Sequence, residues 1–139
     1  MVLYVLAAIL IFGVLIAVHE FGHFITAKLC GVRVNEFSIG MGPGIWSGQR
    51  GETRYSLRAL PIGGYCAMEG EDSSSEDERS LTRQGFFKQL LIFAAGSIMN
   101  FLTGLLIVLI LYSGSAAFYT TEVVDFAPEF PAQGEDGLQ

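Results

Sequence analysis

Charged residues are scarce in this 139-residue sequence, at 16%, where a typical soluble domain carries about 25%. The shortage comes from two stretches without any Lys, Arg, Asp or Glu, residues 2–18 and 90–112. A helix needs about 20 apolar residues to cross a bilayer. The second stretch is long enough by itself, and the first is long enough if its helix continues to about residue 29. This composition excludes an ordinary soluble domain and predicts two transmembrane helices.

Basic residues are absent from both ends of the chain. All eight Lys and Arg lie between Lys28 and Lys88, so the first apolar stretch lacks the positive start of a secretory signal and we expect it to remain as a helix. The positive-inside rule predicts that residues 28–88 are cytoplasmic and that both ends are extracytoplasmic. The sequence offers no sign of a nucleic-acid partner.

Cysteine is also rare. The two cysteines, Cys30 and Cys66, both fall in the part of the chain predicted to face the reducing cytoplasm. A disulfide is therefore not expected, and we interpret both residues as small packing side chains.

Between the helices the sequence reads as β-structure, over residues 32–68. Residues 53–60 alternate apolar and polar side chains, which predicts a strand with one wet face. In residues 32–40 the apolar phase slips near Asn35, which predicts a bulge or turn there. Residues 47–51 predict a hairpin connection, and residues 61–68 predict a short further strand.

The remaining segments are polar or amphipathic. Residues 69–80 contain no apolar side chain, and we interpret residues 69–84 as an acidic, mobile linker. The second helix is expected over residues 85–113, and residues 114–139 read as the opening of a further soluble domain. Because that tail ends before such a domain could have a core, we expect the chain to be part of a longer protein.

The only two histidines lie within the first apolar helix, in the motif His19-Glu20-x-x-His23. Residues four apart lie about 40° apart on one helix face, so both imidazoles can bind one metal ion. Glu20 is not well placed as a third ligand, but it can reach the attacking water. The motif predicts a Zn²⁺ hydrolase in which two histidines hold the metal and Glu20 is the general base.

A structural role for the motif is the alternative. The three polar groups could bond to another helix, but they would then be buried without chemical benefit. An ionisable residue inside a membrane helix costs about 2.5 kcal/mol or more and is by default a functional candidate. We therefore favour metal-dependent hydrolysis.

Four blocks of sequence resemble one known family in the same order. They are "HEFGHF" (19–24), "FSIGMGP" (37–43), "RGETRYSLRALPIGGY" (50–65) and "GSIMNF" (96–101). The chain resembles the site-2 proteases, the zinc intramembrane metalloproteases, and is most similar to the bacterial regulator-of-sigma-E protease branch. The resemblance implies an α-helical membrane protein of the bacterial inner membrane. Its two transmembrane helices would be joined by a short membrane-associated β-sheet segment, and residues 114–139 would begin a PDZ-like domain.

The resemblance also implies roles for individual residues. An edge strand would hold the substrate in extended form, and it would comprise Gly64, Tyr65, Cys66, Ala67 and Met68. Asn100 would point toward the catalytic region and bond substrate, with helix–helix contact as its alternative role. Gly96, Asn100 and Gly104, spaced by four, would let the second helix approach the first closely. The family's third zinc ligand is an Asp in a later membrane helix, which we expect beyond Gln139.

The sequence departs from the family pattern at three positions. Ser97 stands where the family usually has Pro, which leaves open whether the second helix is kinked there. Cys66 and Ala67 stand where the family often has Val-Lys, so a basic contact to substrate is missing.

The sequence thus predicts part of an intramembrane zinc endopeptidase. Its partners would be the lipid bilayer and a single-pass membrane protein substrate, such as an anti-sigma factor or a signal-peptide remnant. Two alternatives stay open. One is a different H-E-x-x-H membrane protease acting on soluble or prenylated substrates. The other is a non-catalytic membrane scaffold with a peptide-binding PDZ domain.

Overall fold

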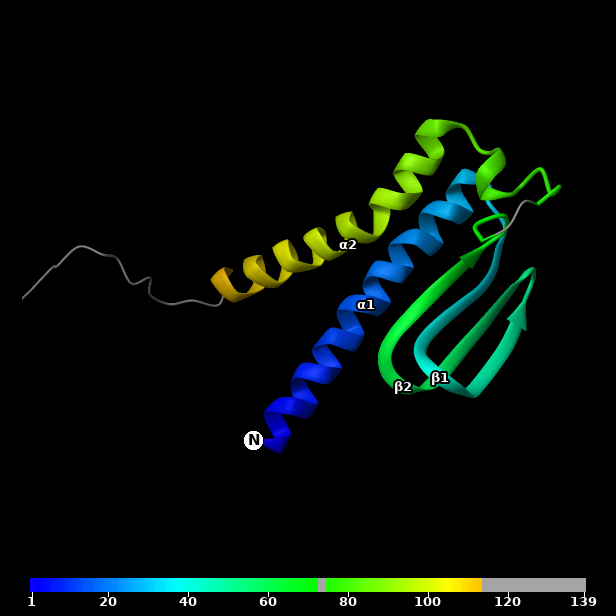
Figure 1. Cartoon of the computed structure of the whole chain (residues 1–139). Coiled ribbons are helices and arrows are strands. Elements are labelled where there is room, and N and C mark those ends of the chain that lie inside the picture. The colour runs from blue at the N-terminus through cyan, green and yellow to red at the C-terminus, as the bar shows by residue number, and fades with distance from the viewer. Residues whose placement is uncertain (73–74, 114–139) are drawn as a thin grey trace, which may run out of the picture. The chain divides into compact units, whose positions relative to one another are not determined.

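The computed structural model describes residues 1–72 and 75–113 (Figure 1). The elements in order are helix α1 (Val2–Cys30), strands β1 (Val34–Arg50) and β2 (Thr53–Met68), the 3₁₀ turn η1 (Leu81–Arg83) and helix α2 (Phe86–Ser113). Two long apolar helices flanking an antiparallel sheet confirm the coarse fold prediction. The PDZ-like start predicted at residues 114–139 lies outside the described residues. The chain divides into the units Met1–Ile107 and Val108–Gln139, and the contacts below belong to the first.

Both helices are long and apolar enough to cross a membrane. Most of their large apolar side chains are exposed, including Leu10, Phe12 and Phe101, and so much apolar surface in contact with water would be unfavourable. α1 ends in a Schellman motif at Gly31, whose φ of 83° is easily adopted by glycine. The Val32 amide completes the motif by donating to the Ala27 carbonyl at 2.9 Å. The chain thereby turns sharply from α1 toward the sheet.

The register of the sheet shows that β1 is paired on two sides. Residues 36 to 39 pair in order with residues 67 to 64. The same four residues also pair in order with residues 54 to 57. Since a strand has only two edges, this first half of β1 lies between the two halves of β2. Among the described residues, the 64–68 segment has partners on one side only, which leaves its other edge free of strand partners.

The predicted irregularity near Asn35 is confirmed. Val34 pairs with Met68 and Glu36 pairs with Ala67, so one extra residue, Asn35, forms a bulge and shifts the apolar phase. The prediction of a separate strand over residues 61–68 is wrong, because β2 runs from Thr53 to Met68 without interruption. Gly63, with φ 88°, bends this strand and does not end it.

The buried core is small and lies where the end of α1, the sheet and the start of α2 meet. Phe24 of α1 packs on Phe37 and Tyr55, with ring centroids 5.0 and 5.9 Å apart. The fully buried side chains Val32, Val34 and Ile92 complete it. α1 and α2 approach closely at Gly22, where an added Cβ would lie 2.6 Å from the Ala95 carbonyl oxygen.

The described residues of the acidic linker make hydrogen bonds to the rest of the domain. Arg79 donates two hydrogen bonds of 2.7 Å to the Glu52 carboxylate, which also accepts from Lys28 at the end of α1 at 2.6 Å. These bonds to Arg79 and Lys28 lower the pKa of Glu52 to about 2. The linker contacts were not anticipated from its composition.

Candidate metal centre

The two histidines project from one face of α1 and converge at their ring tips. Their Nε2 atoms lie 3.1 Å apart, and the rings are arranged edge to face, with centroids 4.8 Å apart. The four-residue spacing on an uninterrupted helix produces this arrangement. It presents two imidazole nitrogens to one point in space, as the sequence predicts.

Helix α2 supplies a partner for the other nitrogen of each ring. Nδ1 of His23 lies 2.8 Å from the carbonyl oxygen of Ile92, and Nδ1 of His19 lies 3.3 Å from Nδ2 of Asn100. Ile92 and Asn100 are eight residues apart, two turns on one face of α2. The helix therefore contacts Nδ1 of both rings, while their Nε2 atoms face each other.

Gly96 lies midway between those two residues and provides room at the ring tips. A Cβ there would lie 2.5 Å from Nε2 of both His19 and His23, closer than any ordinary contact. The residues fit a metal ion, because two imidazole nitrogens converge and the helix opposite them has a glycine there, with no side chain to fill the space. Sequence reasoning noted Gly96 only as a helix-packing residue. The prediction that Gly104 also makes a close approach is wrong, since nothing lies within 4 Å of a Cβ placed there.

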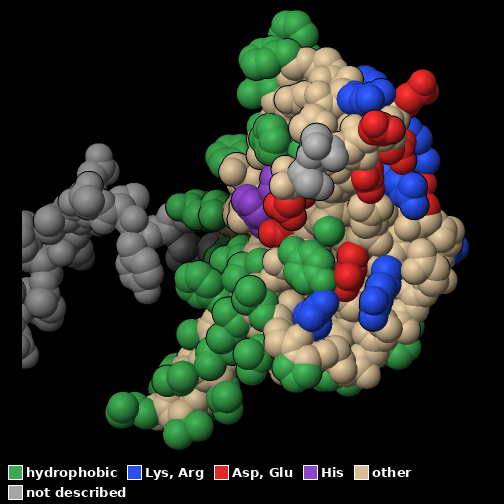
Figure 2. Space-filling view, turned by 45° about the vertical axis from the view of Figure 1, so that its right-hand side comes forward, with side chains coloured by type: hydrophobic (Ala, Val, Ile, Leu, Met, Phe, Trp, Pro, Cys, Tyr) green, Lys and Arg blue, Asp and Glu red, His purple; other side chains and the backbone are tan. Residues whose placement is uncertain are grey.

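Glu20 faces the sheet. Its Cγ would lie 3.4 Å from a Cβ on Gly64, and it lines a hollow of about 500 Å³ together with His23 and β2 residues 65–68. Figure 2 shows the two histidines, in purple, beside acidic side chains and bordered by hydrophobic ones. The general-base candidate thus lies between the histidine pair and the 64–68 segment.

The side chains of the 64–68 segment are held in place by their own contacts. The Tyr65 hydroxyl accepts a 2.5 Å hydrogen bond from Arg58, whose guanidinium lies 5.1 Å from the Tyr65 ring centroid. Cys66 is buried, and burial, with Glu20 and Glu71 adding negative charge nearby, raises the pKa of its thiol to about 12. The side chains of Tyr65 and Cys66 are therefore held by contacts within the protein.

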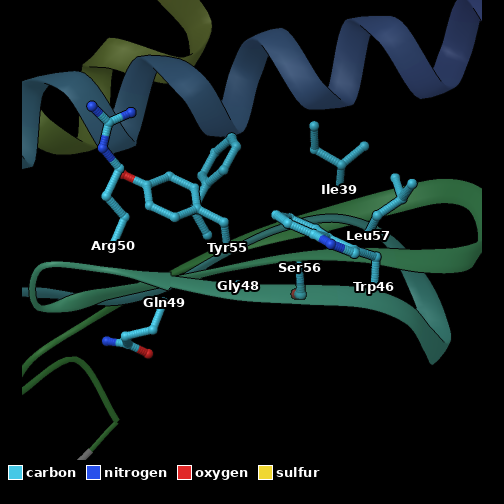
Figure 3. Close-up of a pocket in the computed structure, with 9 residues that line it drawn as sticks. Ile39, Trp46, Gly48, Gln49, Arg50, Tyr55, Ser56 and Leu57 are labelled. Carbon is cyan, nitrogen blue, oxygen red and sulfur yellow. The ribbon is translucent and has the colours of Figure 1, made fainter.

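A larger hollow of about 630 Å³ lies on the sheet face turned toward α1 (Figure 3). In that view Tyr55, Ile39 and Leu57 point toward the helix, whereas Gln49 and Ser56 point away. It contains no residue of the His-Glu-His motif. Of these two hollows, only the smaller one is lined by Glu20 and His23. We therefore assign the candidate site to the smaller hollow.

A complete ligand set is absent from the part of the chain that is described. No group of three His, Cys, Asp or Glu side chains close enough to hold a metal ion occurs in residues 1–72 and 75–113. His19 and His23 are the two donors present, and a catalytic zinc site has three protein ligands. The third ligand predicted beyond Gln139 stays a prediction.

An H-E-x-x-H helix whose histidines converge beside a free strand edge defines a metallopeptidase class of site. Comparison with known proteins agrees. The model of the family described as Peptidase family M50 matches residues 7–132. The chain therefore belongs to this family, which includes the site-2 proteases.

Three relatives, each provisionally named a zinc metalloprotease, are similar to the chain. The Clostridium perfringens protein is 44% identical over 99% of this chain and 40% of its own length. The Clostridium acetobutylicum protein is 52% identical over 69% of this chain and 28% of its own length. The Fusobacterium nucleatum protein is 42% identical over 86% of this chain and 36% of its own length. The chain spans well under half the length of these relatives.

Proposed function

We propose that this chain forms the histidine-bearing part of an intramembrane zinc endopeptidase that cleaves single-pass membrane proteins. One observation carries the proposal: two histidine Nε2 atoms meet 3.1 Å apart inside an apolar helix, beside Glu20 and a strand edge. The names of the relatives support zinc as the metal. Membership of the M50 family argues against the alternative of a different H-E-x-x-H protease family.

The histidines and Glu20 have separate roles in the proposed reaction. His19, His23 and a further ligand would hold the zinc ion, which would supply Lewis acidity toward the scissile carbonyl and the attacking water. Glu20 takes the proton of that water and returns it to the leaving amine. Its position between the histidines and the 64–68 segment suits this transfer.

The strand edge addresses a difficulty of helical substrates. A transmembrane helix has its peptide groups bonded internally, so it must unwind before a peptide bond can be attacked. The 64–68 segment offers main-chain hydrogen bonds to an unwound substrate, the mode known as β-augmentation. A Cβ added to Gly64 would lie 3.4 Å from Cγ of Glu20, so a substrate paired along this edge would lie near the general base.

The location follows the same proposal. Residues 28–88 would be cytoplasmic and both ends extracytoplasmic, which puts His19, about 26 Å along α1, within the bilayer near its cytoplasmic side. Substrates would be remnants left by a first cut outside the membrane, such as an anti-sigma factor or a signal-peptide remnant.

The decisive experiment changes Glu20 without changing its shape. In the full-length protein, Glu20→Gln should abolish cleavage of a single-pass substrate in detergent while the zinc content stays equal to that of the unaltered protein. Loss of zinc would show that Glu20 is a ligand and not the base. Retention of cleavage would reject Glu20 as the general base.

A further inference from the structure

Asn100 has a buried atom without a partner. Its Nδ2 lies 3.3 Å from Nδ1 of His19, but its Oδ1 is buried and has no hydrogen-bond partner among the described residues. Buried acceptors are rarely left unpaired, and an exception asks for an explanation. The explanation lies in where the protons of the histidine pair sit.

For two neutral imidazoles, the contacts assign the protons. The Ile92 carbonyl can only accept, so Nδ1 of His23, 2.8 Å away, carries that ring's proton and its Nε2 is bare. The hydrogen in the 3.1 Å contact between the two Nε2 atoms then belongs to His19. With its proton on Nε2, His19 presents a bare Nδ1, which accepts from the Asn100 amine. This arrangement is self-consistent only while Nε2 of His19 is protonated.

Metal binding requires the opposite tautomer of His19. A metal ligand donates a lone pair, so both Nε2 atoms must be bare and the His19 proton must move to Nδ1. There it would face the Asn100 amine, donor against donor. The two ends of an amide have nearly the same shape, so a half-turn about the terminal torsion of Asn100 brings Oδ1 to the same place, where it can accept from Nδ1 of His19 while the amine takes the former position of Oδ1.

We propose that Asn100 is a positioning residue whose Oδ1 accepts the Nδ1–H of His19 and holds that ring in its metal-binding tautomer. Ile92 does the same for His23 through its carbonyl. The two partners stand four residues either side of Gly96, eight residues apart on one face of α2. This inference rests on the proposed metal site, and it replaces the substrate contact that the family resemblance implies for Asn100.

The test measures zinc affinity in the full-length protein in detergent, by competition with a chelator. Asn100→Leu removes the acceptor at similar size and should weaken zinc binding about 10- to 100-fold, the range for such outer partners. Asn100→Asp keeps an oxygen acceptor but has no amine, and should bind zinc within a few-fold of the unaltered protein. Thr103→Val, which removes a hydroxyl bonded only to the Met99 carbonyl, is the matched control and should change nothing.

Either Asn100 variant can overturn the inference. Unchanged affinity in Asn100→Leu, with a raised KM for substrate, would overturn the inference in favour of substrate binding. Weakened binding in Asn100→Asp would overturn it by showing that the amine is needed, and this arm decides even if the leucine variant fails to fold. Absence of zinc from the unaltered protein would instead reject the proposed function itself.

Discussion

The contact between Gly96 and the histidine pair makes the most direct prediction. A methyl group at this position would lie 2.5 Å from Nε2 of both His19 and His23 and 2.6 Å from Cε1 of His19. Since ordinary van der Waals contact begins at 3.4 Å, the rings or the helices must separate by about 1 Å. Gly96→Ala should therefore disrupt the metal centre and little else.

The size of the effect follows from two limits. Metal–ligand distances are held within about 0.2 Å, so a shift of about 1 Å is far outside the tolerance of the site. Overpacking a well-packed contact costs about 1–3 kcal/mol, which corresponds to roughly a 5- to 150-fold loss of affinity. We expect zinc binding to weaken within that range and cleavage to fall at least in proportion.

The control is a second glycine on the same helix. Gly104→Ala makes the same chemical change two turns away, where nothing lies within 4 Å of the added Cβ, and it should leave zinc affinity unchanged. Both variants would be assayed as full-length proteins by chelator competition and by substrate cleavage in the same detergent. Equal zinc affinity in Gly96→Ala and Gly104→Ala would refute the close approach of α2 to the histidines.

Three further predictions concern the parts around the site. Because the folded-state pKa of Glu52 is about 2, against an ordinary value of 4.5, its contribution is fully present above about pH 5 and is lost as the pH falls toward 2. Glu52→Gln should lower stability at pH 7 by about 1–2 kcal/mol after solvent screening, and thermal melts of the two proteins should converge near pH 2; a constant gap would contradict this. Proline placed separately at Cys66 and Ala67 should reduce cleavage of a helical substrate with zinc retained, since neighbouring residues of a strand direct their amides to opposite edges, and full cleavage in both variants would eliminate the substrate edge. A cysteine replacing the exposed Gln49 should resist an impermeant thiol reagent outside intact cells and react after permeabilisation, and labelling of sealed cells would reverse the proposed orientation.

Cys66 itself is unsuited to the last experiment. It is buried in the sheet, and its pKa of about 12 leaves almost no thiolate to react at neutral pH. Failure to label it would therefore say nothing about which side of a membrane it faces. An exposed position in the hairpin is needed, because only there does accessibility report topology.

Local patterns were enough to predict several features. The four-residue spacing of His19 and His23 places them on one face, because an α-helix repeats every 3.6 residues. The long uncharged run predicts the helix itself. The bulge at Asn35 was predicted because the side-chain period of a strand is two, so a slip in apolar phase requires an extra residue. Both predictions depend only on residues that are close together in the sequence.

Other features depend on contacts distant in sequence, and no local pattern contains them. That Gly96 and not Gly104 meets α1 depends on the point at which the helices approach, which the even spacing of the two glycines does not encode. The double pairing of residues 36–39 needs β2 to bend at Gly63 and return to β1. The anchoring of the acidic linker depends on Arg79 reaching Glu52, 27 residues away, and its composition alone favoured a solvated chain.

The ring contacts also explain how an apolar helix tolerates two histidines. A polar side chain within a membrane is costly unless its hydrogen bonds are made, and here all four ring nitrogens have a polar partner. Each Nδ1 contacts α2 through Ile92 or Asn100, and the two Nε2 atoms contact each other. In the proposed site a bound ion would take the place of the contact between the two Nε2 atoms, and a further ligand would still be required. The contact of His23 with Ile92 would stay as it is, and the Asn100 amide would turn so that its Oδ1 accepts from Nδ1 of His19.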